Sequence, residues 1–162
     1  MIRLTSKFIR IFFLLVILSS AVSLSAAEGK FGAGFILGDP TGLTGKYYVS
    51  SADALDFGLG AFYGDGFYLY CDYLRHFPGV FPIRELALYL GGGGGFHHHD
   101  SDSDRNHHRD EYNSLECRVP LGVEYTPDKA PLGIFAEIVP ALQVIPDVDS
   151  DIRGGIGVRY YF

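Results

Sequence analysis

The side chains best suited to binding a metal ion lie in one segment rich in histidine and acidic residues. It runs from 95 to 113 and holds five of the six histidines of the chain. Neutral imidazole binds zinc, copper and nickel, and carboxylates can add oxygen ligands. The candidate ligands are His97, His98, His99, His107, His108, Asp100, Asp102, Asp104 and Glu111. The segment therefore predicts either weak binding of a divalent or transition metal or a solvated surface loop without a defined site.

Four of these acidic residues also have the spacing of a calcium loop. Asp100, Asp102, Asp104 and Glu111 match positions 1, 3, 5 and 12 of an EF-hand. That loop needs glycine at position 6, where this chain has Arg105, and it needs flanking helices. A specific calcium site is therefore not expected, and no resident cofactor is predicted.

Eight further charged residues share one face of the predicted strands. Carboxylates brought together in this way could act as acid and base, but mixed charges also form ion pairs for purely structural reasons. No serine-containing hydrolase motif accompanies His76, and the glycine run 91–95 lacks the Lys-Ser/Thr of a phosphate loop. We therefore expect no catalysis and a structural network made of Lys46, Asp56, Asp72, Glu116, Arg118, Glu124, Glu137 and Arg159.

The elements that hold these charges are predicted from an alternation of apolar and other residues with period two. This pattern indicates eight strands, over 30–37, 43–49, 55–63, 67–77, 86–94, 114–125, 133–144 and 154–162. A charge facing acyl chains costs about 2 to 4 kcal/mol at the membrane midplane, so the charged face is expected to line the interior. The fold class is therefore all-β, an eight-stranded antiparallel up-and-down transmembrane barrel with a polar, plugged lumen. A soluble lipocalin-like barrel would have the two faces reversed.

The connections should alternate between the two sides of the membrane. Outer connections are expected at 38–42, 64–66, 95–113 and 146–153, with the long outer loop over 95–113. Inner connections are expected at 50–54, 78–85 and 126–132. Pro120 and Pro140 fall inside predicted strands, where bulges or bends are expected because proline cannot donate to the ladder.

Both ends of the chain carry signals for export. Residues 1–27 have three basic residues, a short apolar run and a small-residue cleavage site, which indicates a signal peptide and leaves a barrel domain over 28–162. The chain ends on a strand in which Val158, Tyr160 and Phe162 alternate, as in the C-terminal insertion signal of outer-membrane barrels. We therefore expect a monomer in the bacterial outer membrane, exported through the periplasm, with membrane lipids and the barrel-assembly machinery as its partners.

Charge and cysteine content limit the alternatives. After removal of the signal peptide, 10 basic residues remain against 19 acidic ones, a net charge of −9 that argues against nucleic acid as a partner. Cys71 and Cys117 are predicted to face outward with one strand between them, about 10 Å apart at the usual strand spacing. That separation exceeds the ~7 Å limit for a disulfide, so both thiols are expected to be free.

Several motifs resemble those of a known family. They are the segments 36–48, 88–91, 118–123, 135–140 and 155–162, which include Gly38-Asp39-Pro40-Thr41-Gly42 and the aromatic C-terminus. In these the chain resembles a family of small, uncharacterised bacterial outer-membrane barrels, OmpA- and OmpX-like in architecture. The resemblance implies an eight-stranded outer-membrane barrel and no known activity. We therefore expect a structural or surface-interaction role, with metal binding or sensing by the His-rich loop and a lipid-modifying enzyme as alternatives.

Overall fold

The regular structure of the protein consists of nine antiparallel strands in the residues that the computed structural model describes, 29–61, 66–99 and 112–162. They are β1 Phe31–Gly38, β2 Thr41–Tyr48, β3 Asp53–Ala61, β4 Gly66–Pro78, β5 Leu86–His99, β6 Tyr112–Arg118, β7 Leu121–Tyr125, β8 Leu132–Ile145 and β9 Asp149–Tyr161. Aromatic and β-branched residues recur along them, as strands favour. Among these described residues, no helix is long and apolar enough to cross a membrane.

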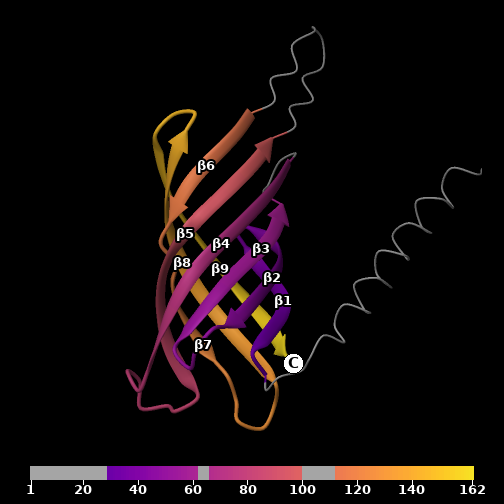
Figure 1. Ribbon diagram of the computed structural model, residues 1–162, viewed down its shortest axis with the longest axis vertical. Helices are drawn as coiled ribbons and strands as arrows, with labels where there is room; N and C mark the ends of the chain where they lie inside the picture. The colour runs from indigo at the N-terminus through magenta and orange to yellow at the C-terminus, as the bar shows by residue number, and fades with distance from the viewer. Residues whose placement is uncertain (1–28, 62–65, 100–111) are drawn as a thin grey trace, which may run out of the picture.

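Strand pairing closes the sheet into a ring. Neighbours in the chain pair from β1 to β5 and from β8 to β9, and β1 pairs with β9. β6 and β7 lie end to end in the wall, since each pairs with both β5 and β8. Figure 1 shows the inclined strands wrapping around a common axis. We call the end of the ring that holds Phe162 the terminal end, and the opposite end, where β8 turns into β9, the hairpin end.

The strand predicted over 114–125 is divided in the structure. β6 ends at Arg118 and β7 begins at Leu121, with Pro120 between them. Proline has no N–H to give to a ladder, whereas its carbonyl oxygen still accepts a hydrogen bond from Gly91 N at 2.9 Å. The prediction of one continuous strand is therefore wrong at this proline, although the wall continues past it.

The two longest predicted outer loops are partly strand in the structure. β5 continues to His99 and β6 starts at Tyr112, so the loop predicted over 95–113 is wrong at both of its ends. β9 starts at Asp149, so most of the loop predicted over 146–153 pairs with β8. The backbone of a polar residue bonds in an antiparallel ladder as well as that of an apolar one, and here a neighbouring strand is present to pair with it.

The two faces of the wall differ in polarity. Large apolar side chains such as Phe35, Leu59 and Ile134 are exposed on the outer face. Tyr68, Tyr89 and the charged groups described below are buried in the interior. The distribution is the reverse of that in a soluble globular protein, in which apolar side chains fill the interior and charged side chains are mostly exposed.

The glycine run of β5 makes room for this interior. A Cβ added at Gly93 would lie 2.2 Å from Asp72 Oδ1, and one at Gly95 would lie 2.5 Å from Tyr68 Oη. Gly94 is exposed, and a Cβ there would meet only a backbone oxygen at 3.4 Å. The interior glycines of this strand are thus needed to fit side chains from its neighbours.

The two cysteines flank the same residue of β5. Cys71 in β4 and Cys117 in β6 both pair with Gly94, from opposite sides. Both are free and exposed, so the prediction that they form no disulfide is confirmed.

Candidate functional site

The interior holds all eight charged side chains that the sequence grouped on one strand face. Each is buried, and Lys46 and Arg159 have no exposed surface. They form three groups along the axis of the ring. We call these the terminal cluster, around Glu124; the central pair, formed by Arg118 and Asp72; and the hairpin-end cluster, around Glu116.

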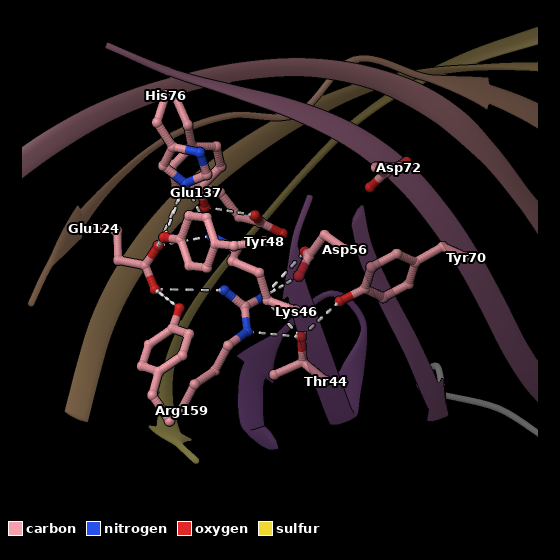
Figure 2. A network of polar contacts seen from close by, with 12 residues as sticks. Thr44, Lys46, Tyr48, Asp56, Tyr70, Asp72, His76, Glu124, Glu137 and Arg159 are labelled. Atoms are coloured by element: carbon pink, nitrogen blue, oxygen red, sulfur yellow. Dashed lines mark hydrogen bonds and ion pairs between the residues drawn. The ribbon is translucent and has the colours of Figure 1, made fainter. Parts of the chain in front are cut away.

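In the terminal cluster, Glu124 of β7 accepts hydrogen bonds from side chains of two other strands, β2 and β9. Lys46 Nζ donates to Glu124 Oε2 at 2.7 Å and Tyr161 Oη donates to Oε1 at 2.5 Å. Lys46 Nζ also lies 3.3 Å from His76 Nε2. His76 Nε2 also lies 3.5 Å from Glu124 Oε2, and its Nδ1 lies 3.3 Å from the oxygen of Ala52. Figure 2 shows these side chains converging between the strands.

Arg159 of β9 is the most extensively bonded cation of the terminal cluster. Its Nη2 lies 2.8 Å from Asp56 Oδ1 and donates to Thr44 Oγ1 at 2.7 Å. The guanidinium carbon also lies 3.8 Å from the centre of the Phe135 ring. These contacts join β9 to β2, β3 and β8 through one side chain.

The central pair links β6 to β4. Arg118 Nε lies 3.0 Å from Asp72 Oδ2, and Arg118 Nη2 lies 3.9 Å from Glu137 Oε1. The guanidinium carbon stacks 4.0 Å from the Tyr70 ring centre, and Glu137 accepts a bond from Tyr89 Oη at 2.7 Å. Arg118 therefore shares its single positive charge between two buried carboxylates of different strands.

In the hairpin-end cluster, Glu116 is held by an arginine that the sequence did not indicate. Arg153 donates to both of its oxygens, with Nη1 to Oε1 at 2.8 Å and Nη2 to Oε2 at 2.7 Å. His97 Nε2 lies 3.4 Å from Oε2, and Tyr68 Oη donates to Oε1. Arg118 Nη1 donates to Tyr68 Oη at 2.6 Å, which connects this cluster to the central pair.

Asp39, in the turn between β1 and β2, lies close to this cluster. Its backbone N donates to Gly154 O at 3.0 Å. Burial raises the pKa of the Asp39 carboxyl above its ordinary value, and the positive charge of Arg153 opposes that rise. The turn thereby extends the polar interior to the end of the short β1–β2 wall.

Sequence reasoning missed three interior residues, Arg153, His76 and His97, although the alternation contained the signal for each. Arg153 has the parity of Arg159, six residues later, but was assigned to a loop. His76 has the parity of Asp72 in the same strand, and His97 that of Gly95 and Gly93. His76 lies inside the strand predicted over 67–77, where its parity already placed it on the inner face, and extending the pattern past residue 94 and before residue 154 would have placed His97 and Arg153 there as well.

The structure separates the described members of the predicted metal site. His97 points toward Glu116 in the interior, whereas His98 is half-buried and its Nδ1 lies 2.8 Å from Asn113 Oδ1. His99 ends β5. In the described ranges, no group of three or more His, Cys, Asp or Glu side chains is placed to hold a metal ion. The other predicted ligands, Asp100, Asp102, Asp104, His107, His108 and Glu111, lie outside the described residues, so metal binding stays a prediction.

The predicted insertion residues lie on the outer face near the terminal end. Val158 and Tyr160 are exposed on β9. Phe162 stacks on Phe31 with ring centres 6.2 Å apart and meets the edge of Tyr160 at 5.0 Å. The last residue therefore packs across the seam where the ring closes.

The interior chemistry is one of mutual compensation. Each of the five strand carboxylates has a cation within 4 Å: Asp56 with Arg159, Asp72 and Glu137 with Arg118, Glu116 with Arg153, and Glu124 with Lys46. Buried charges are tolerated when they are paired and hydrogen-bonded, as Glu116 and Glu124 are, whereas Asp72 has its ion pair with Arg118 and no hydrogen bond among the described side chains. The arrangement suits cross-linking of the wall.

Comparison with known proteins defines the family. A model described as "Protein of unknown function (DUF3996)" matches residues 22–160. The chain belongs to this family. The fold of this DUF3996 protein is similar to the N-terminal β-barrel domain of Pseudomonas aeruginosa OprF, with a TM-score of 0.61 and 17% sequence identity over 82% of this chain and 95% of that one. No curated protein matches the chain. The likeness in structure concerns the fold, and it confirms the antiparallel β-barrel class expected from the sequence.

Proposed function

We propose that this DUF3996 protein is an integral outer-membrane barrel with a structural or surface-interaction role and no catalytic activity. Eight wall positions, with β6 and β7 sharing one of them, make up its transmembrane ring. The lumen is plugged by the protein's own side chains, and the outer connections are its contact elements. In this proposal it inserts as a monomer after export through the periplasm.

One observation carries the proposal, the distribution of polarity across the wall. The outer face exposes large apolar side chains around the whole ring, including Leu43 on β2, Leu69 on β4, Leu121 on β7 and Ile156 on β9. Exposed apolar surface of this extent is not stable in water and is typical of a protein that contacts lipid. The similarity to the OprF barrel domain supports the same environment.

The interior supports a plugged lumen instead of a pore. Arg118, Arg159, Tyr68, Tyr89 and Lys46 are among the largest fully buried side chains, and they fill the space between opposite walls. Eight-stranded barrels have an interior just wide enough for side chains to fill. Paired interior charges also leave little to attract a passing ion.

The test has two parts. The chain without residues 1–27 is refolded in detergent, and unheated and boiled samples are compared by gel mobility and circular dichroism. A strand-rich, heat-modifiable form that needs detergent or lipid supports the membrane barrel, whereas a soluble monomer refutes it. The refolded protein is then added to planar bilayers, and steady ion conductance at neutral pH would refute the plugged lumen.

A further inference from the structure

The apolar outer surface of the ring is uneven in height. β1 and β2 have 8 residues each, whereas β8 has 14 and β9 has 13. Gly38, the last residue of β1, pairs with Gly155, and β9 extends beyond that pair to Asp149. At ~3.3 Å per residue and a tilt of about 40°, these six residues add roughly 15 Å along the axis. Figure 1 shows the β8–β9 hairpin and the ends of β5 and β6 rising above the β1–β2 side.

This raised wall carries exposed apolar side chains up to its edge. Ile152 is 75% exposed and Val148 is 76% exposed. We call the whole group the hairpin patch, and it consists of Leu115, Leu142, Val144, Ile145, Val148 and Ile152.

A β-bulge enlarges the hairpin patch. Leu115 pairs with Ile145 and Glu116 pairs with Gln143, so Val144 is an extra residue of β8 at this point. Paired residues face the same side, so Ile145 lies on the outer face with Leu115, while Gln143 stays on the inner side with Glu116. Two consecutive apolar residues of β8, Val144 and Ile145, are thereby exposed on the outer face.

The free edge of β9 points away from β8 in this region. Gly154 O faces the β1 side, since Asp39 N donates to it, and the N–H groups of Ile152 and Ser150 face the same side because backbone direction repeats every second residue. β1 does not reach this level, so these amides form an open strand edge.

That edge is protected against the addition of another strand. Asp149 Oδ1 accepts a bond from Ser150 N at 2.9 Å, and Asp151 Oδ1 accepts one from Ile152 N at 2.8 Å. The carboxylates occupy the amides that an added strand would use, and charged residues on an edge disfavour such pairing. A protein partner that binds by strand addition therefore does not fit the raised wall.

The hairpin patch instead continues the lipid-facing wall. Along the wall toward the hairpin end, the patch lies beyond Ile138 on β8 and beyond Ile156 on β9, and both of these residues are exposed on the outer face. We propose that acyl chains of the outer leaflet cover the hairpin patch, so that the membrane surface lies higher along the ring at β8–β9 than at β1–β2. The ring is then tilted in the bilayer, or the bilayer is thinner beside β1–β2. This inference rests on the proposed function, because it requires the ring to be inserted in a membrane.

The chain contains no tryptophan, so single-tryptophan variants report depth directly. Val144→Trp reports the hairpin patch, Thr41→Trp the end of the β1–β2 wall and Ile138→Trp the exposed middle of β8. Each variant is first checked for heat-modifiable gel mobility and refolded into phosphatidylcholine vesicles with or without bromine on the middle of the acyl chains. Ile152→Trp is a second reporter of the patch, should Val144→Trp not fold.

Quenching at 144 close to that at 138, and several-fold stronger than at 41, is the expected result. Equal quenching at 144 and 41, whether weak or strong, would overturn the uneven insertion while leaving the barrel in the membrane. An unquenched tryptophan at 138 would overturn the proposed function itself. The two failures are therefore distinguishable in one experiment.

Discussion

Replacing Arg159 by methionine should be among the most damaging single substitutions in the interior. The side chain has no exposed surface. Among the described residues, it is the only cation that forms an ion pair with Asp56. Methionine keeps much of the volume beside Phe135 but removes the charge and the bonds to Thr44. Removing one partner of a buried ion pair costs about 3 to 5 kcal/mol because the other charge is left uncompensated. We expect that loss in the free energy of unfolding.

A double-mutant cycle separates the ion pair from the packing. Asp56→Asn combined with Arg159→Met removes both charges, so the double variant should be more stable than the sum of the two single losses predicts, by about 1 to 3 kcal/mol. The assay is equilibrium urea unfolding in phospholipid vesicles, followed by gel mobility and circular dichroism. Val158→Ala, on the outer face next to Arg159, is the control and should cost about 1 kcal/mol or less. Additive single losses, or a loss below about 1 kcal/mol for Arg159→Met, would refute a stabilising role for the network.

Three further predictions use matched variants. Gly93→Ala should destabilise the folded form by at least about 1 kcal/mol in the same assay, because its Cβ would lie 2.2 Å from Cys71 O. Gly94→Ala is the control and should be neutral or stabilising. Equal effects of the two substitutions would contradict the account of β5. Arg153→Gln should lower the free energy of unfolding by about 1 to 3 kcal/mol. Arg75→Gln, which removes an exposed ion pair with Asp53, should lower it by less than about 1 kcal/mol. The reverse order of the two losses would refute a stabilising role for the Arg153–Glu116 pair. Both Cys71 and Cys117 should react with a maleimide in the folded, unreduced protein in detergent, as mass spectrometry would show by two adducts, and a disulfide would disprove the register around Gly94.

The sequence by itself determined the faces of the wall. Side chains alternate across a strand, so charge parity alone predicted that residues as far apart as Lys46 and Arg159 share the interior. Parity also predicted that both cysteines face outward, whereas their failure to form a disulfide followed from the expected strand order, which puts one strand between them. The irregularity at Pro120 was expected because proline cannot donate to the ladder, but the period of two did not show that the strand divides there.

Only the tertiary structure decided which charges meet and where the strands end. Glu124 bonds to Lys46, 78 residues away, because closure of the ring brings β7 opposite β2. Arg153 becomes the partner of Glu116 because β8 and β9 continue past the last apolar alternation and pair with each other. Register and ring closure depend on cross-strand hydrogen bonds between distant segments, and the bulge at Val144 shifts that register locally. Such pairings are properties of two strands together, so the pattern within one strand cannot specify them.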